Sequence, residues 1–458
     1  MNHLNQTNSI PKRVTNLAIS TYVTAIFCCN VLFASHMLEW QWWFFGAIEV
    51  LGFFYFANRL SKSWFYVRPL HFTQKLFWSA FILRALWVVI SYFLYKNWTS
   101  TAFSIDAADE LYYNDIAQYA ADKIRYGQWN VYNTIIEASP DNAFSDMGYP
   151  IYLTIIYWIF GNSIFIARVI KAILSAWTVV LMYKLATRNF GEQVGRMTAI
   201  MCMLMPNLIY YCSFQLKEVE MVFLCILFAE RADFLLRKGN LAFMPMAALM
   251  LIPAFMFMIR TALAAVMVMA FFCALLLSSD RIVSWGRRAL LLTLALVFAG
   301  VVFTTSTSIG QDVMAMWQTR GSAQQTNMEW RAVRDVGQGM TQKFAKYAGA
   351  AVFAPMIFTI PFPTMAYTFQ GQEHIMMQSG GYFVKNVLSF FVILVFSNFA
   401  QSGRFHMPIM PLFMMFAAYG MSFLNIKRFE RWYNYVLVLE VIVCIAWAWF
   451  KLAGRGLA

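Results

Sequence analysis

Three carboxylates lie within five residues of one another in an otherwise apolar chain: Asp106, Asp109 and Glu110. They open the polar, tyrosine-rich stretch DAADELYYNDIAQYAADKIRYGQWN, residues 106–130. A carboxylate beside aromatic side chains is suited to general-base catalysis, in which it takes a proton from an attacking hydroxyl. The plainer interpretation is a surface helix with Asp106 or Asp109 as its N-cap and Glu110 in its first turn, where acids are favoured. The residues alone leave both interpretations open.

Cations recur near the expected outer ends of apolar segments. Lys217 and Glu218 follow YYCSFQ, Arg260 interrupts FMFMIRTALAAV, and Arg404 and His406 precede MPIMP. A charge inside a membrane segment costs about 2.5–3.5 kcal/mol on insertion scales, so such charges usually have a function. Cations near carboxylates suit an anionic lipid head group bound beside a base. For each cation taken singly, snorkelling or a buried ion pair is the alternative.

Composition identifies the class of protein. The chain has 458 residues, of which 60% are hydrophobic and 12% charged, whereas soluble domains are about half apolar and a quarter charged. We therefore predict an all-α, polytopic integral membrane protein that packs as one unit over residues 1–458. The net charge of +13 falls between hydrophobic runs, which indicates topology signals and anionic lipid rather than nucleic acid. The seven cysteines show no metal or disulfide spacing.

Apolar segments long enough to cross a membrane recur along the chain, and we expect about 11–13 transmembrane helices. They lie near residues 14–35, 40–58, 76–95, 162–184, 191–212, 216–236, 241–258, 261–279, 289–306, 347–367, 382–400, 407–424 and 433–450. Arg84, Arg168 and Lys171 fall inside them. If these helices alternate in direction, the Lys and Arg residues of the short loops share one side, which should be cytoplasmic together with the N-terminus. In this count the loop near 371–381 should also be cytoplasmic, although it has no Lys or Arg; if residues 347–367 are re-entrant rather than spanning, the later topology changes.

Two long loops then lie outside the membrane. The first, residues 96–160, carries the carboxylates and ends in GYPIYLTIIYWIF, which is short for a span and suits an interfacial helix. The second is residues 307–346. Residues 109–125 have the pattern of an amphipathic helix with Tyr112, Ile116, Tyr119 and Lys123 on one face, and Asp106, Asp109, Glu110 and Tyr113 on a neighbouring face. We expect that acidic face to point into a cavity at the membrane surface.

Five motifs follow one another along the chain. The first is a DE-x-x-Y…A…G-x-W pattern that begins with Asp109, Glu110 and Tyr113. It is followed by GYPIYLTIIYWIFG and by a G-x-S…R pattern that ends at Arg168. The last two are MPNLIYYCSFQLKE and SGRFHMPIMPLFMMFAAYG. In this order they resemble the polytopic GT-C glycosyltransferases, especially bacterial relatives of protein O-mannosyltransferases and lipid A aminoarabinose transferases, which are similar to glycosyltransferase family 39. The resemblance covers about residues 76–240 and 400–425. Ile151 stands where the family usually has a second proline.

The resemblance implies a GT-C-like fold with interfacial helices in the first large extracytoplasmic loop. It also implies a transfer reaction. A sugar would move from a polyprenyl-phosphate donor to the hydroxyl of a glycan, lipid or protein acceptor, with inversion, at the periplasmic face of a bacterial inner membrane. It implies Asp109 as general base, with Glu110 or Asp106 orienting the base, the acceptor or a divalent ion. The donor phosphate would bind Lys217, Arg260 and Arg404, and the substrates would contact Tyr113, Tyr149, Glu218 and His406.

No cofactor is expected, since the chain has no nucleotide-binding motif, in agreement with a lipid-linked donor. The five histidines have no metal-ligand spacing, so no metal site is predicted, although Mg²⁺ or Mn²⁺ between Asp109 or Glu110 and the phosphate remains compatible with the residues. One alternative function is an O-antigen-type polymerase or ligase, for which Arg320, Arg331 and Arg334 would be candidates. Others are a transporter or flippase of a lipid-linked glycan, for which the expected repeated halves are not seen, and a membrane scaffold.

Overall fold

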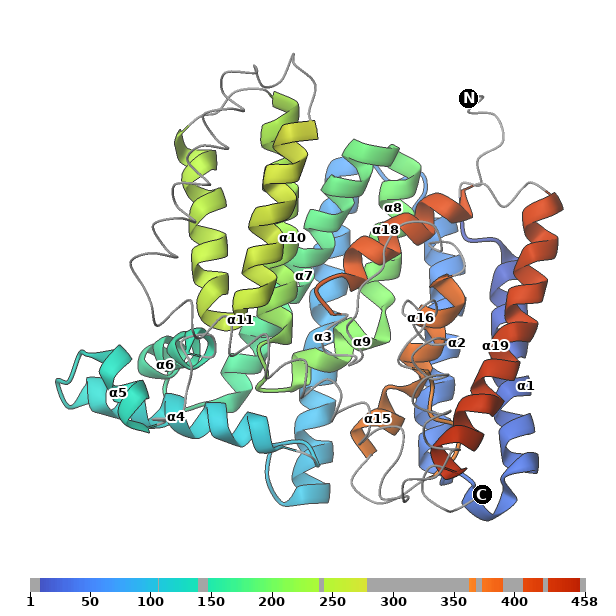
Figure 1. The fold of residues 1–458 in the computed structure, drawn as a ribbon, viewed down its shortest axis with the longest axis horizontal. Helices are drawn as coiled ribbons and strands as arrows, with labels where there is room; N and C mark the ends of the chain where they lie inside the picture. Colours follow the sequence, from blue (N-terminus) through green and yellow to red (C-terminus); the bar gives the residue numbers. More distant parts are fainter. Residues whose placement is uncertain are drawn as a thin grey trace, which may run out of the picture.

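The computed structural model describes residues 9–105, 107–138, 147–238, 243–277, 362–367, 373–389, 407–422 and 427–453. Throughout these ranges the regular structure is helical and no strand occurs, which confirms the all-α prediction (Figure 1). The helices are α1 (Lys12–Leu32), α2 (Trp40–Ser63), α3 (Pro69–Thr99), α4 (Ala108–Arg125), α5 (Val131–Ala138), α6 (Gly148–Phe160), α7 (Ile164–Phe190), α8 (Glu192–Leu204), α9 (Pro206–Tyr210), α10 (Glu218–Lys238), α11 (Phe243–Leu277), α15 (Glu373–Met377), α16 (Ser379–Ser389), α18 (Met410–Met421) and α19 (Lys427–Ala453).

Four helices of the described chain are long and apolar enough to cross a membrane: Lys12–Leu32, Pro69–Thr99, Ile164–Phe190 and Arg431–Trp449. Shorter apolar helices occupy Leu249–Thr261, Leu263–Ala274 and Met410–Met421, within or close to three further predicted spans. These helices are consistent with a polytopic membrane protein. The predicted span 289–306 and the second long loop, 307–346, lie outside the described residues.

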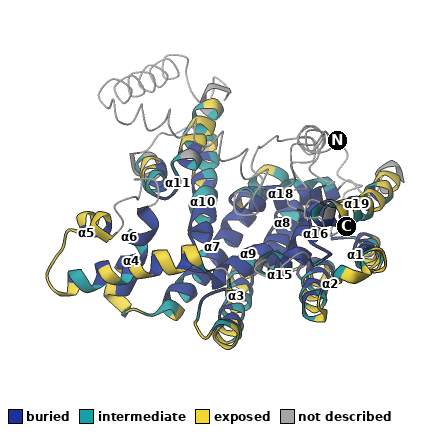
Figure 2. Ribbon diagram, turned by 60° about the horizontal axis from the view of Figure 1, so that its bottom comes forward, coloured by how far each residue is buried: buried dark blue, intermediate teal, exposed yellow. Residues whose placement is uncertain are grey.

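Helix α7 lies at the centre of the bundle. It packs against α3, α8 and α10, while α4 packs on α6, α1 on α19 and α16 on α2. Buried residues concentrate on α6, α7, α9 and α16, and exposed ones on the outer sides of α1, α3 and α5 (Figure 2). Many exposed residues on the outer helices are large and apolar, among them Phe27, Ile82, Phe93 and Ile442. Such an outer surface is suited to contact with lipid chains.

The predicted span 191–212 is not one continuous helix. Helix α8 ends at Leu204, and α9 begins at Pro206 and is followed by a 3₁₀ turn at Tyr211–Ser213. Pro206 has no N–H, so it cannot donate the hydrogen bond that the carbonyl of Cys202 would accept in a continuous helix. The predicted span is therefore interrupted, because the proline ends α8 inside the bundle.

The guanidinium of Arg84 satisfies the carbonyls at this break. It is fully buried and donates to the carbonyl oxygens of Cys202 and Met203, each at 3.2 Å. Its Nε donates to Ser175 Oγ on α7 at 2.6 Å. A buried arginine in a predicted span thus connects α3, α7 and the end of α8, and its role here is to support the fold.

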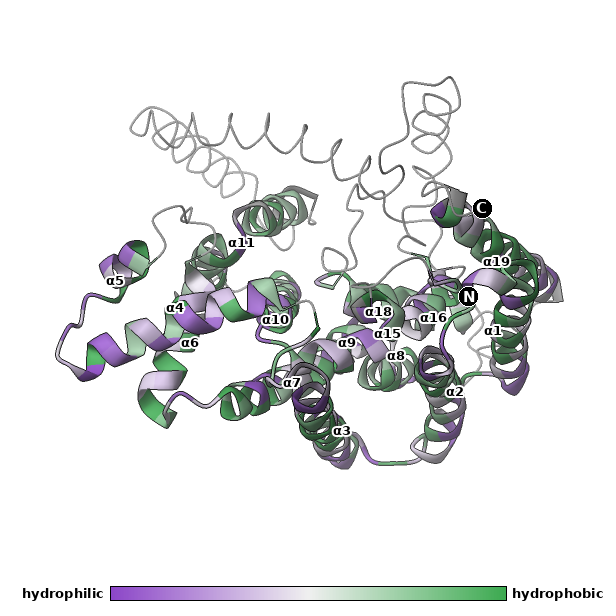
Figure 3. Ribbon diagram, turned by 90° about the horizontal axis from the view of Figure 1, so that it is seen from below, coloured by the Kyte–Doolittle hydropathy of each residue, from purple (hydrophilic) through white to green (hydrophobic). Residues whose placement is uncertain are grey.

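The two ends of the bundle differ in chemistry. Figure 1 places the start of α3 and the ends of α2, α7 and α10 on one side, which we call the basic end because it carries Arg59, Lys62, Arg188 and Arg237. Helices α4, α5, α6 and α15 lie on the opposite side, the α4 end. Seen from this end, α4 and α5 alternate between hydrophilic and hydrophobic stretches, whereas α11 and α19 are mainly hydrophobic (Figure 3). The basic residues at these helix ends share one side, whereas Arg281, Arg287 and Arg288, which the prediction places there too, lie outside the described residues.

The loop near 371–381 does not lie at the basic end. Residues 362–367, the last part of a predicted span, are not helical, and the backbone N–H of Tyr367 donates to the carbonyl of His36 at 2.9 Å. Helix α15 packs against α2, whose first residues adjoin the turn at His36. The expectation that this loop shares the side of the basic loops is wrong. Its lack of Lys and Arg agrees with its position at the α4 end.

Candidate functional site

Helix α4 buries Glu110 and Tyr113 of the predicted acidic face and leaves most of the face of Tyr112, Ile116, Tyr119 and Lys123 uncovered. Tyr112 and Tyr119 are exposed, and of the four residues on that face only Ile116 is buried. The buried residues are Glu110, Tyr113, Asn114, Ile116, Ala117, Ala120, Ala121 and Ile124. The alanines let α4 approach α6 closely, and this close packing decides which face is covered. Glu110 and Tyr113 consequently point into the protein, whereas Asp109 is exposed.

The carboxylate of Glu110 joins three segments. Its side chain is buried, and Oε2 accepts from the backbone N–H of Gln215 at 2.8 Å and from the guanidinium of Arg168 at 3.4 Å. Oε1 accepts from the backbone N–H and the hydroxyl of Ser104. Glu110 therefore holds the start of α4, the middle of the bundle and the loop before α10 together. Because Asp109 is the adjacent residue, the same contacts fix its backbone.

Two buried cations of α7 face this region from one side of the helix. Arg168 is fully buried, and besides its ion pair with Glu110 its guanidinium lies 6.0 Å from the ring centre of Phe103. Its Nε and Nη1 atoms have no hydrogen-bond partner among the described residues. Ser163 caps the start of α7 by accepting from the N–H of Ile166, which fixes the register of the helix that carries Arg168.

Lys171, one turn further along α7, supports the loop before α10. It is fully buried and donates to the carbonyl oxygens of Phe214, at 2.8 Å, and Leu216. Its Nζ also lies 3.5 Å from Glu220 Oε2 and 4.9 Å from the ring centre of Tyr149. The sequence shows both α7 cations as charges within a predicted span. It does not show that they lie at the candidate site.

Four of the predicted substrate and phosphate residues come together around this loop. The Nζ of Lys217 lies 5.6 Å from the ring centre of Tyr113, and the rings of Tyr113 and Tyr149 are in edge-to-face contact at 5.2 Å. Glu218 begins α10, is buried and directly follows Lys217 in the sequence. Burial raises the pKa of the Tyr149 phenol well above its ordinary value, so this hydroxyl stays protonated at neutral pH.

Arg260 lies at a break in α11, in agreement with the predicted meeting of two spans. Its backbone is extended, with φ −159° and ψ 91°, inside an otherwise helical segment. Gly148 packs directly on the preceding turn: a Cβ at Gly148 would lie 2.8 Å from the Cβ of Met258 and 2.9 Å from its carbonyl carbon. The absence of a side chain at Gly148 therefore brings the start of α6, and with it Tyr149, against the turn that leads to Arg260.

A second polar network, which the sequence did not indicate, supports the site from α6. The hydroxyl of Tyr157 donates to Asn114 Oδ1 at 2.8 Å and accepts from Gln215 Nε2 at 3.0 Å. The guanidinium of Arg125 donates to the carbonyl of Tyr157. Gln215 thus binds Glu110 through its backbone and Tyr157 through its side chain. Both contacts fix the loop that ends at Lys217.

Three predicted site residues, Asp106, Arg404 and His406, lie outside the described residues, as do the three arginines of the loop 307–346. Within the part of the chain that the structure describes, no group of three or more His, Cys, Asp or Glu side chains could hold a metal ion. The described site therefore consists of an exposed carboxylate, Asp109, beside a buried assembly of carboxylates, cations and tyrosines. Such an arrangement can bind an anionic group and accept a proton at the membrane surface.

Comparison with known proteins agrees with this chemistry. Residues 147–306 match a family model described as dolichyl-phosphate-mannose-protein mannosyltransferase. The matched range begins just before α6 and includes α7, α10 and α11, so it contains Arg168, Lys171, Lys217 and Arg260. No curated protein and no solved structure matches the chain. The family match confirms the predicted resemblance to GT-C-like glycosyltransferases.

Proposed function

We propose that this chain, as a membrane glycosyltransferase of the GT-C type, transfers a sugar from a polyprenyl-phosphate donor to the hydroxyl of a glycan, lipid or protein acceptor. The description of the matched family names a sugar linked to a lipid phosphate, which supports the donor class. The positive-inside rule assigns the basic end to the cytoplasm. The α4 end then faces the outside of a bacterial inner membrane and carries the reaction.

The observation that carries this proposal is the contact of Glu110 with the backbone N–H of Gln215. It connects the residue next to Asp109, on α4, with the loop that ends at Lys217. A base for the acceptor and a cation for the donor phosphate are thereby parts of one assembly, although they are about a hundred residues apart in the chain. A transferase requires this pairing of groups, since the acceptor and the leaving phosphate must be bound at the same time.

The reaction is a single displacement. The acceptor oxygen attacks the anomeric carbon, and its proton passes to the carboxylate of Asp109. The bond between the anomeric carbon and the phosphate oxygen breaks, and its electron pair leaves with polyprenyl phosphate. Lys217 and Arg260, with Arg404, offset the negative charge on that phosphate. Attack opposite to the leaving group inverts the anomeric configuration.

The first test is release of polyprenyl phosphate by purified protein in nanodiscs, given a panel of polyprenyl-phosphate sugars with candidate acceptors. We expect Asp109→Asn to lower kcat by about 10²–10⁴-fold with little change in the KM of the donor, the usual contribution of a general base. Asp115→Asn, a change to another exposed carboxylate of α4, is the matched control and should retain activity.

Thermal unfolding of each variant separates loss of catalysis from loss of fold. If folded Asp109→Asn releases polyprenyl phosphate as fast as wild type, Asp109 is not the base. If wild type releases none from any donor in the presence of every acceptor class, the proposed reaction is wrong. The anomeric configuration of the product, read by NMR, tests inversion independently of both results.

A further inference from the structure

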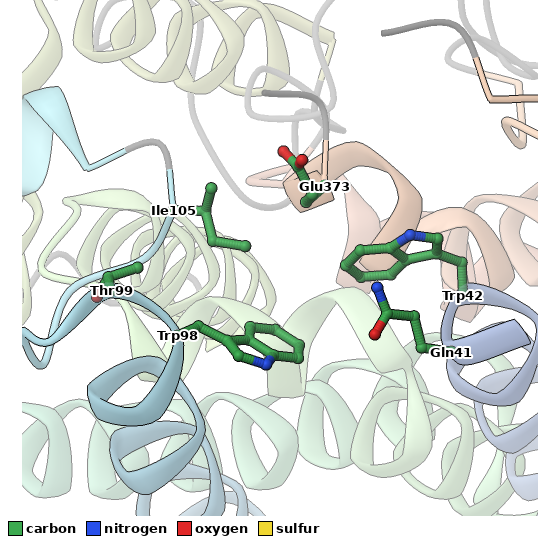
Figure 4. A pocket seen from close by; sticks show the side chains of 6 residues that line it. All are labelled: Gln41, Trp42, Trp98, Thr99, Ile105 and Glu373. Atoms are coloured by element: carbon green, nitrogen blue, oxygen red, sulfur yellow. The ribbon is translucent and has the colours of Figure 1, made fainter. Parts of the chain in front are cut away.

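A cavity of about 270 Å³ opens at the α4 end (Figure 4), and none of its lining residues is among the partners of Glu110. It lies between the start of α2, the end of α3 and the start of α15. Its lining residues are Gln41, Trp42, Trp98, Thr99, Ile105 and Glu373. The volume is slightly below the range of about 300–1,000 Å³ typical of sites for drug-sized ligands, so it suits one small ring.

The length of α3 places this cavity outside the hydrocarbon layer. Helix α3 has 31 residues and begins at the basic end. At about 1.5 Å per residue it is about 46 Å long, whereas the hydrocarbon core is about 30 Å thick. Trp98 is in its last turn, after Lys96. The cavity therefore lies at the level of lipid head groups or beyond them, where polar ligands rather than lipid chains are found.

The lining residues have the chemistry of a carbohydrate site. Trp42 and Trp98 lie edge to face, with ring centres 6.1 Å apart. Indole faces carry partial negative charge and attract the polarised C–H groups of a sugar ring. The amide of Gln41 is oriented by a 2.6 Å hydrogen bond from its Nε2 to Glu39. Amide and carboxylate groups such as those of Gln41 and Glu373 are suited to binding sugar hydroxyls.

Glu373 distinguishes this cavity from an ordinary interfacial belt of tryptophans. It lines the cavity beside Trp42 and Trp98, and a carboxylate accepts hydrogen bonds from hydroxyl groups. Tryptophan alone at this level would be explained by the membrane interface. The carboxylate points instead to a polar ligand.

The cavity is connected to the candidate site through two consecutive residues. Ile105 lines the cavity, and Ser104, the residue before it, donates to Glu110 from its backbone N–H and its hydroxyl. A ligand in the cavity therefore touches the segment that leads directly into α4 and Asp109. We propose that the cavity binds one sugar ring of a glycan acceptor. This inference rests on the proposed transferase function, and it narrows the acceptor from three classes to one.

The test combines binding and kinetics in nanodiscs. Saturation-transfer NMR with a panel of monosaccharides and disaccharides measures binding without any need for turnover. Trp98→Ala is the main variant because Trp98 is 37% exposed, whereas Trp42 is 4% exposed and its removal would endanger the fold. Gln41→Ala is the second variant. Trp78→Ala is the matched control, since Trp78 is on the same helix, is 58% exposed and does not line the cavity.

We expect Trp98→Ala to weaken binding of the sugar and to raise the KM of the glycan acceptor by about two- to tenfold, the size of one aromatic contact. Gln41→Ala should act in the same direction, and Trp78→Ala should change neither quantity. The KM of the polyprenyl-phosphate donor should stay unchanged in all three variants.

Three results would overturn the proposal: no saturable binding of any sugar to wild type, binding that Trp98→Ala leaves unchanged, or a rise in the KM of the donor instead of the acceptor. The last result would assign the cavity to the donor sugar. Release of polyprenyl phosphate by wild type, measured in the same nanodiscs, keeps the two proposals separate. Release that persists while the cavity test fails leaves the transferase function intact, and absence of release refutes that function whatever the NMR shows.

Discussion

At the scale of single residues, neighbouring carboxylates have different environments. Asp109 is exposed, whereas Glu110 is buried and is held by Ser104, Gln215 and Arg168. A carboxylate that already accepts this many hydrogen bonds is suited to positioning other groups, and an exposed one is suited to exchanging a proton with a substrate. The pair therefore divides the two tasks between adjacent positions of one helix.

Glu110→Gln should destabilise the protein, because it leaves the buried guanidinium of Arg168 without a counter-charge. Breaking a buried ion pair costs about 3–5 kcal/mol, so we expect a clear fall in the thermal unfolding midpoint, measured by scanning fluorimetry. The double variant with Arg168→Met removes the orphaned charge and should recover part of the loss. A single variant as stable as wild type would show that the pair contributes little.

At the scale of helices, close contacts at small residues set the geometry of the site. Gly148 is the sharpest case, since α6 and the turn before Arg260 approach each other at its Cα. The alanines of α4 act in the same way against α6. The positions of Tyr149 and Arg260 thus depend on residues that carry no chemistry of their own.

Gly148→Ala should reduce transfer activity strongly, since the new methyl would meet the backbone of Met258 at 2.9 Å and push α6 away from α11. The expected loss of stability is about 1–3 kcal/mol. Gly52→Ala is the matched control: it lies within α2, where a Cβ would meet nothing within 4 Å. That change should be neutral or slightly stabilising. Equal activity in the two variants would exclude the close contact as a determinant of the site.

Arg84 and Pro206 offer a second test at this scale. Arg84→Met should leave the carbonyls of Cys202 and Met203 without their donors, at about 1–3 kcal/mol for each unsatisfied group. Adding Pro206→Ala restores an N–H that can donate to Cys202, so the double variant should be more stable than Arg84→Met alone. Strictly additive unfolding free energies in this double-mutant cycle would show that Arg84 does not compensate for the proline.

For the whole molecule, the features that sequence predicts well are those with local signals. Hydropathy predicts the helical membrane class, and the order of the motifs predicts the family resemblance that the match confirms. The contacts of the α7 cations are long-range: Arg168 meets Glu110 58 residues away, and Lys171 meets Leu216 45 residues away. No spacing rule encodes such pairs. The alanines of the buried face of α4 were not predicted to be buried, because alanine carries a weak hydrophobic signal.

The orientation of the bundle is a prediction at this largest scale. Tyr66, which precedes α3, is exposed at the basic end. Asn97, in the last turn of α3, is exposed at the α4 end. In a cysteine-free version of the chain in intact cells, Asn97→Cys should react with a membrane-impermeant maleimide, whereas Tyr66→Cys should react only after permeabilisation. The reverse pattern would place the candidate site in the cytoplasm.

The sharing of one carboxylate by two loops has a thermodynamic consequence. Ser104 and Gln215 bind different oxygens of Glu110, so a shift of either loop must move that carboxylate or break a hydrogen bond. Ligands that contact the two loops are then energetically linked: each changes the affinity of the other by the same factor. The affinity for the donor would then depend on whether the acceptor is bound, and the reverse. The hydrogen bonds of Glu110 would set the size of this effect and, with it, the preferred order in which the two substrates bind.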